Sequence, residues 1–249
     1  MTSARPVLWF VAAQTAITFL HEATHAGVAY LAGVPGTLFN FLVDLDRSHA
    51  TTSSLAVIGV SGPLVCLLAG GCLWMAYRRS GEARVRLPLV LLSIFALSTF
   101  CGNLMSAAFA GDFSAAARLL EVPLPVRYAT SAVGAIATAT VMFLGGRALA
   151  GLAPAGSGQL ARVTGMVLVP VAAGTALVVL INWPMPGVTA MARIGEAAFW
   201  LFALAGAGFA RSPSRGTAAA AAVRLPDLAA LLASVLVVRI LMAGIPFMP

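Results

Sequence analysis

Residues 7–32 read VLWFVAAQTAITFLHEATHAGVAYLA, an apolar run long enough to cross a lipid bilayer as a helix. Apart from the HExxH sequence His21-Glu22-Ala23-Thr24-His25, this run contains no Asp, Glu, Lys, Arg or His. On a helix, residues i and i+4 share a face, so the two imidazoles can bind one metal ion while the glutamate between them reaches a water molecule. Because ionisable groups are costly in lipid, the cluster indicates a functional site inside a membrane helix.

The composition predicts an all-α, polytopic transmembrane bundle of about six or seven helices. The chain has 249 residues, of which 60% are hydrophobic and 9% charged. We expect one membrane domain in which residues 1–115 hold the chemistry and residues 116–249 add further helices. The start of the chain also resembles a signal peptide, but cleavage would remove the HExxH sequence, so we expect an uncleaved first helix. The apolar segments are 7–32, 55–77, 87–110, 126–150, 163–183, 189–210 and 227–246.

Arginine placement predicts the orientation in the membrane. All fifteen basic residues are arginines and the net charge is +7, but they lie between apolar segments, which argues against a nucleic-acid partner. The positive-inside rule instead places the N-terminus in the cytoplasm, and the arginine-rich, lysine-free composition is typical of a high-GC bacterial genome. We therefore expect a multi-pass protein of the bacterial cell membrane. The ten arginines on the cytoplasmic side would be Arg5, Arg78, Arg79, Arg84, Arg86, Arg147, Arg162, Arg211, Arg215 and Arg224.

A hydrolytic zinc site needs a third protein ligand and an open position for water. Depth in the membrane favours Asp112, because it directly follows the third apolar segment, which runs in the same direction as the first. Two alternatives stay open: Asp112 is an ordinary helix N-cap after Gly111, or His49 in the polar loop is the third ligand. The full set of candidates is Asp44, Asp46, His49, Asp112, Glu121 and Glu196.

Two further motifs accompany the HExxH sequence. Ser61-Gly62-Pro63-Leu64 lies in the second segment, and Gly102-Asn103-Leu104 precedes Asp112, which follows the asparagine by nine residues. Together the motifs resemble those of the site-2 proteases, zinc intramembrane metalloproteases, in their short form without a PDZ domain, over about residues 15–115. The resemblance implies that Asp112 is the third zinc ligand and that Asn103 contacts the substrate or the developing oxyanion. The chain carries Cys66 where that family usually has asparagine.

These residues predict an intramembrane zinc metalloprotease that cuts a transmembrane or membrane-adjacent peptide. His21, His25 and Asp112 would hold Zn²⁺, and Glu22 would act as general base and acid. The alternative is a non-enzymatic transporter or assembly factor whose polar cluster binds a metal ion or carries protons. A prenyl-protein protease of the HExxH type ranks low, since neither later glutamate has a histidine at the required spacing.

Two features outside these motifs carry weaker signals. The loop from Pro35 to Ser53 contains an apolar patch at residues 38–43, which favours either a re-entrant hairpin that offers an edge to an extended substrate or a plain interfacial loop. The three cysteines, Cys66, Cys72 and Cys101, lack CxxC spacing. We expect them to be small apolar fillers within helices.

Overall fold

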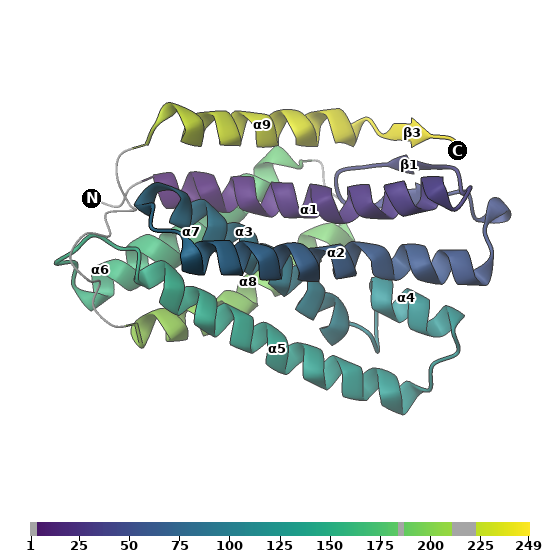
Figure 1. Cartoon of the computed structure of the whole chain (residues 1–249), viewed down its shortest axis with the longest axis horizontal. Coiled ribbons are helices and arrows are strands. Elements are labelled where there is room, and N and C mark those ends of the chain that lie inside the picture. Colours follow the sequence, from purple (N-terminus) through teal and green to yellow (C-terminus); the bar gives the residue numbers. More distant parts are fainter. Residues whose placement is uncertain (1–3, 184–186, 211–222) are drawn as a thin grey trace.

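The predicted helical bundle is confirmed. A computed structural model describes residues 4–183, 187–210 and 223–249 and, for residues 187–197, only the backbone. Long helices run side by side along the length of the molecule (Figure 1). Each of the seven apolar segments corresponds to helix. The helices are α1 (Arg5–Leu31), α2 (Thr52–Arg79), α3 (Ala83–Met105), α4 (Asp112–Leu119), α5 (Leu124–Ala150), α6 (Gln159–Val163), the π-helical turn η2 (Thr164–Leu168), α7 (Val169–Ile181), α8 (Gly187–Gly208) and α9 (Leu225–Met242).

The molecule is a multi-pass membrane protein by the length and apolarity of its helices. Five helical stretches of the described chain can cross a bilayer: α2, α3, α5, the continuous stretch Gln159–Ile181, and α9. Helix α1 is of similar length, with 27 residues, but it is not among these five, and its buried side chains include Gln14, His21, Glu22 and His25. Other helices surround α1, so its polar side chains face protein rather than lipid.

Helix α1 lies at the centre of the bundle, between α2 and α9 in Figure 1, and it also packs on α3 and α7. An aromatic cluster fixes its first half: the ring of Phe10 lies 4.9 Å from that of Phe95 on α3 and 5.3 Å from that of Trp200 on α8. At the N-terminal end, the guanidinium of Arg5 donates to the carboxylate of Asp227 on α9 over 3.0 Å. These contacts hold the site-bearing helix against three neighbours.

The loop after α1 forms a hairpin, and whether this hairpin re-enters the membrane stays a prediction. Strand β1 (Gly36–Leu38) pairs antiparallel with β2 (Val43–Leu45) and also with β3 (Ile245–Phe247), in the order β2-β1-β3. Leu45 and Phe247 pack on a buried cluster of Ala29, Val34 and Ile58. Both edges of β1 are therefore paired, and substrate addition to the outer edge of β2 stays a prediction.

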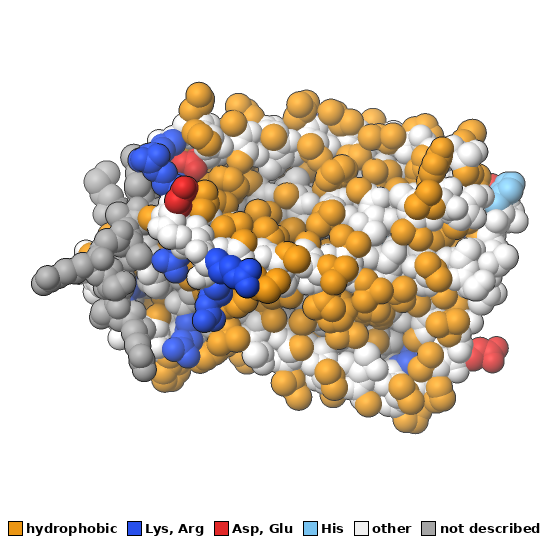
Figure 2. Space-filling view, viewed as in Figure 1, with side chains coloured by type: hydrophobic (Ala, Val, Ile, Leu, Met, Phe, Trp, Pro, Cys, Tyr) orange, Lys and Arg blue, Asp and Glu red, His pale blue; other side chains and the backbone are white. Residues whose placement is uncertain are grey.

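The two ends of the bundle differ in their charged residues. Figure 2 shows arginine side chains gathered at one end, and the eight described members of the predicted cytoplasmic set lie at helix ends there. Arg211 and Arg215 lie outside the described residues. The opposite end carries the sheet, the 3-10 helix η1 (Arg47–His49) and α4 (Figure 1). Which end faces the cytoplasm stays a prediction.

The third apolar segment ends earlier than predicted. We expected it to reach residue 110, whereas α3 ends at Met105 and residues 106–111 form a turn. Gly111, with a φ of 82°, closes this turn in a backbone conformation that favours glycine. Asp112 therefore begins a separate helix, and the predicted division at residue 115 falls within α4.

Candidate metal centre

The two histidines of the HExxH sequence face one another on α1. His21 and His25 are one helical turn apart, with exposed fractions of only 7% and 6%. Their rings meet edge to face at a centroid distance of 4.6 Å, and their Nε2 atoms are 3.1 Å apart. The regular helix thus brings two imidazole nitrogens to one point, as the i, i+4 spacing predicts.

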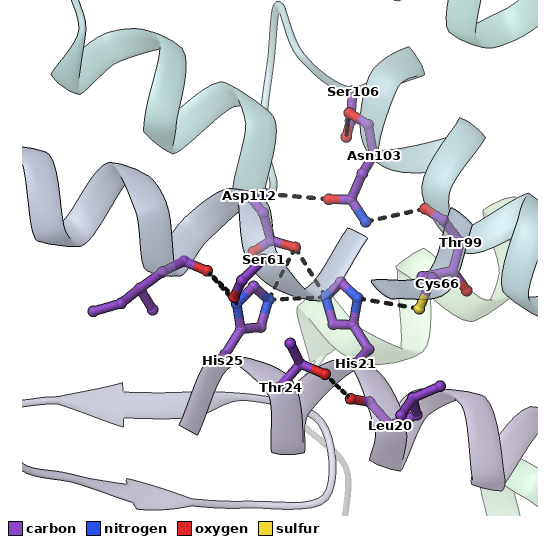
Figure 3. A network of polar contacts seen from close by, with 11 residues as sticks. Leu20, His21, Thr24, His25, Ser61, Cys66, Thr99, Asn103, Ser106 and Asp112 are labelled. Carbon is purple, nitrogen blue, oxygen red and sulfur yellow. Dashed lines mark hydrogen bonds and ion pairs between the residues drawn. The ribbon is translucent and has the colours of Figure 1, made fainter. Parts of the chain in front are cut away.

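Asp112 reaches the same point from α4. Its Oδ2 atom lies 2.9 Å from Nε2 of His21 and 3.5 Å from Nε2 of His25 (Figure 3). The N-cap of α4 is Gly111, and Asp112 is the first residue of the helix, so Asp112 is an acidic residue at the helix end as the alternative expected, but it is not the N-cap itself. The carboxylate instead points to the imidazole pair, at the depth that the sequence predicted.

The spacing of these three atoms suits a single metal ion. Tetrahedral zinc with ligands at about 2.0–2.1 Å places its ligand atoms about 3.3 Å apart. The observed separations of 2.9, 3.1 and 3.5 Å bracket that value. A simple ion pair accounts for one imidazole facing the carboxylate but gives no reason for the second Nε2 beside it. In the described part of the chain, these residues are the one group of three such side chains that could hold a metal ion.

One face of α2 supports both imidazoles from behind. Ile58, Gly62 and Cys66 follow one another at four-residue spacing. Nδ1 of His25 donates to the carbonyl oxygen of Ile58 over 2.6 Å, which in the neutral ring leaves Nε2 without a proton and able to bind metal. On His21, Nδ1 lies 3.8 Å from Sγ of Cys66.

Gly62 makes room for the two rings. A Cβ atom at this position would lie 2.5 Å from Nε2 of His25 and 3.0 Å from Nδ1 of His21. The next residue, Pro63, lacks an N–H group and interrupts the helical hydrogen bonds of α2. Ser61, the first residue of the same motif, donates its hydroxyl hydrogen to the carbonyl oxygen of Ile58 over 2.7 Å. The Ser-Gly-Pro motif therefore lines the site.

Asn103 holds Asp112 from the other side. Its Oδ1 atom accepts a hydrogen bond from the backbone N–H of Asp112 at 3.3 Å, and its amide donates to the carbonyl of Thr99 at 3.1 Å (Figure 3). This positioning contact was not predicted from the sequence. The predicted contact of Asn103 with a substrate or an oxyanion stays a prediction.

Glu22 is buried beside the imidazole pair. Its side chain follows directly after His21 on α1, with an exposed fraction of 9%. Its predicted role as general base and acid stays a prediction.

The other candidate ligands lie elsewhere. His49 is in η1 with a side chain 60% exposed, and its Nδ1 lies 3.1 Å from a carboxylate oxygen of Asp46. Hydrogen bonds from Ser48 hold the pKa of Asp46 below its usual range. Asp44 and Glu121 are also exposed, whereas the side chain of Glu196 lies outside the described residues. Of the described candidates, only Asp112 meets the histidines.

The chain matches no family model, no curated protein and no solved structure. The distances between the side chains are therefore the basis for assigning the site. Two imidazole nitrogens and one carboxylate oxygen converge between α1 and α4 and could hold a metal ion. The roles of Ile58 and Cys66 were not predicted from the sequence; their helical spacing from Gly62 is a signal for them, but it does not say which face of α2 meets α1.

Proposed function

We propose that this chain is an intramembrane zinc metalloprotease, similar in its site to the short site-2 proteases without a PDZ domain. The convergence of Nε2 of His21, Nε2 of His25 and Oδ2 of Asp112 within a membrane helix bundle carries the proposal. Two nitrogens and one oxygen are a common ligand set of catalytic zinc, which leaves one coordination position open.

The residues around the metal supply the remaining chemistry. Zinc held there would polarise the scissile carbonyl and lower the pKa of water. Glu22 would take the proton of the attacking water and return it to the leaving amine. Asn103 uses its amide oxygen to orient Asp112, and the one amide N–H that does not bond to the Thr99 carbonyl would donate to the developing oxyanion.

The substrate would be a transmembrane or membrane-adjacent peptide. The position of the site between membrane-spanning helices supports this, since a peptide from the lipid phase is the substrate that such a site can meet. A helical substrate hides its peptide bonds within its own hydrogen bonds, so the segment must unwind before hydrolysis. Pro63 interrupts the hydrogen bonds of α2 beside the imidazoles. This interruption supports the proposal that an unwound substrate segment fits there.

We also propose a bacterial cell-membrane location with a cytoplasmic N-terminus. The arginines at the N-terminal end of the bundle support this orientation (Figure 2). The site then lies toward the non-cytoplasmic side, because His25 is closer to the end of α1 than to its start.

Glu22→Gln tests the enzymatic role. The purified full chain should contain about one zinc ion per molecule, and His21→Ala should lose it. Glu22→Gln should keep the zinc and lose hydrolysis. Hydrolysis is measured by reconstituting each protein with bacterial membrane proteins and identifying new peptide termini by mass spectrometry. New termini of membrane segments that are present with the wild type and absent with Glu22→Gln support the proposal.

A non-enzymatic transporter or assembly factor remains the second candidate. It is favoured by the large part of the bundle, α5 to α9, in which the described residues hold no comparable cluster. Zinc bound at one equivalent, with the same peptide termini for the wild type and Glu22→Gln, would support this candidate and contradict the protease.

A further inference from the structure

The Nδ1 atoms of the two histidines have different partners. His25 faces a backbone carbonyl, a strong acceptor that any residue at position 58 would offer. His21 faces the sulfur of Cys66 at 3.8 Å, and this contact depends on the side chain. Figure 3 shows the sulfur on the side of the ring opposite Asp112. Cys66 has an exposed fraction of 0%, so no solvent competes for the contact.

The nitrogen that carries the ring proton of His21 decides whether Nε2 can bind a metal ion. Nε2 can bind a cation only when the proton of the neutral ring lies on Nδ1. A buried Nδ1–H group needs an acceptor, and partners of this kind fix the tautomer and orientation of metal-binding histidines. The Cys66 sulfur is in place to accept that hydrogen bond.

We propose that Cys66 is the positioning residue that prepares His21 for metal binding. This inference rests on the proposed metal site and assigns a role to a residue that the sequence analysis treated as an apolar filler. Its sulfur accepts the Nδ1–H of His21, while the Ile58 carbonyl does the same for His25. One face of α2 thereby directs both Nε2 atoms to Asp112.

The other cysteines of the chain provide matched controls. Cys72 lies on the same helix but is exposed, and Cys101 is buried in α3. Neither makes a contact with a site histidine among the described residues. Replacement of either by alanine should therefore leave metal binding unchanged.

Two substitutions of similar size separate hydrogen bonding from packing. Cys66→Val keeps an apolar side chain of comparable volume and removes the acceptor, whereas Cys66→Ser keeps an acceptor. The zinc dissociation constant of each purified full-length protein is measured by competition with a chromophoric chelator. We expect Cys66→Val to weaken zinc binding by about 10- to 100-fold and Cys66→Ser to stay within a few-fold of wild type. Thermal unfolding without metal shows whether each variant is folded.

Cobalt provides a second readout, which reports the geometry of the bound metal rather than its affinity. The visible absorption of bound Co²⁺ reports ligand geometry, so Cys66→Val should shift these bands and Cys66→Ser should keep them close to wild type. Equal zinc affinity for Cys66→Val and the wild type would overturn the proposal. Equal weakening by Val and Ser would overturn it as well, because the hydrogen bond would then be irrelevant.

The same titration separates this inference from the proposed function. A wild-type protein that binds no zinc would overturn both. A wild-type protein that binds one zinc with the expected dependence on Cys66, yet cuts no peptide, would contradict the protease and support the role of Cys66.

Discussion

The side chain of Gly62 is a single hydrogen atom, which leaves space for the imidazoles of His21 and His25. Gly62→Ala would place a methyl group 2.5 Å from Nε2 of His25 and 3.0 Å from Nδ1 of His21, so at least one ring must move. We expect zinc affinity to fall by about tenfold or more, the size of effect found when the supports of metal ligands are lost. Competition with a chromophoric chelator measures the change.

Gly71 offers a matched control for that substitution on the same helix. A Cβ atom at Gly71 would meet nothing within 4 Å. Gly71→Ala should therefore bind zinc like the wild type and gain up to about 1 kcal/mol in stability from its better helix propensity. If Gly62→Ala and Gly71→Ala bind zinc equally well, the geometry of the imidazole pair described above is wrong.

The two roles considered for Asn103 make different predictions. Asn103→Leu keeps the size of the side chain and removes the acceptor of the Asp112 N–H. If the residue positions Asp112, zinc affinity should fall by several-fold to about tenfold. If it acts only on the oxyanion, zinc binding should be unchanged and hydrolysis alone should fall, by about 100-fold or more. Zinc titration and the rate of peptide cleavage on the same preparation decide between these outcomes.

At the residue scale, the sequence predicted the convergence of His21, His25 and Asp112 better than the contacts that support them. The i, i+4 rule placed His21 and His25 together, and depth in the membrane brought Asp112 to them. The contact of Cys66 with His21 was missed, because it depends on how α2 is rotated against α1. That rotation follows from side-chain packing across the bundle, and hydropathy carries no information about it.

Among the elements, α4 packs mainly on α2, and α5 helps to hold it through Arg127. The guanidinium of Arg127 donates to the carbonyls of Ala107 and Ala108, at 3.2 and 2.9 Å, and to the hydroxyl of Ser114 at 3.1 Å. It thus supports the turn before Asp112 and the first turn of α4. Arg127→Met should leave these carbonyls without their donor and lower stability by about 1–3 kcal/mol.

The same substitution should reach the metal site. Because α4 carries Asp112, we expect Arg127→Met to lower zinc affinity by several-fold as well, measured by chelator competition beside thermal unfolding. Arg147→Met, in the last turn of α5 at the opposite end, is the matched control and should bind zinc normally. A loss of stability in Arg127→Met with wild-type zinc affinity would show that α4 is held without this arginine.

Element boundaries show where hydropathy stops being informative. The third segment stays apolar to residue 110, yet α3 ends at Met105, because Arg127 and Ser131 of α5 bond the backbone of the following turn. At the C-terminus, the predicted helix to residue 246 ends at Met242, and Ile245–Phe247 pairs with β1 instead. In both places the partner is distant in sequence, so a local pattern could not reveal it.

For the whole molecule, apolarity was sufficient to predict a membrane bundle but not its arrangement. Seven apolar segments predicted the helices, and the structure has helix at all of them. The central position of α1 follows from its polar side chains, because a helix with Gln14, His21, Glu22 and His25 is stable in a membrane only when protein surrounds it. The polar residues that indicate the site therefore also explain why this helix lies inside.

The last prediction concerns which end of the molecule faces the cytoplasm. The two termini lie at opposite ends of the bundle (Figure 1), with the arginines at the N-terminal end. Ser48→Cys in exposed η1 and Gly81→Cys between α2 and α3 place single labels at the two ends, in a background where exposed Cys72 is replaced by alanine. A membrane-impermeant maleimide should label Ser48→Cys in intact cells, and Gly81→Cys only after permeabilisation, because the positive-inside rule keeps the arginine loops in the cytoplasm.

The reverse labelling pattern would show that the arginine count misplaces the protein, and it would move the site toward the cytoplasmic face. This difference has a functional consequence, because His21 and His25 lie in the half of α1 that is distant from the arginines. With the expected orientation, cleavage would occur in the outer half of the membrane and release a fragment to the outside. With the inverted orientation, the proposed protease would cut near the cytoplasmic face, so the labelling experiment decides to which side of the membrane its product would be released.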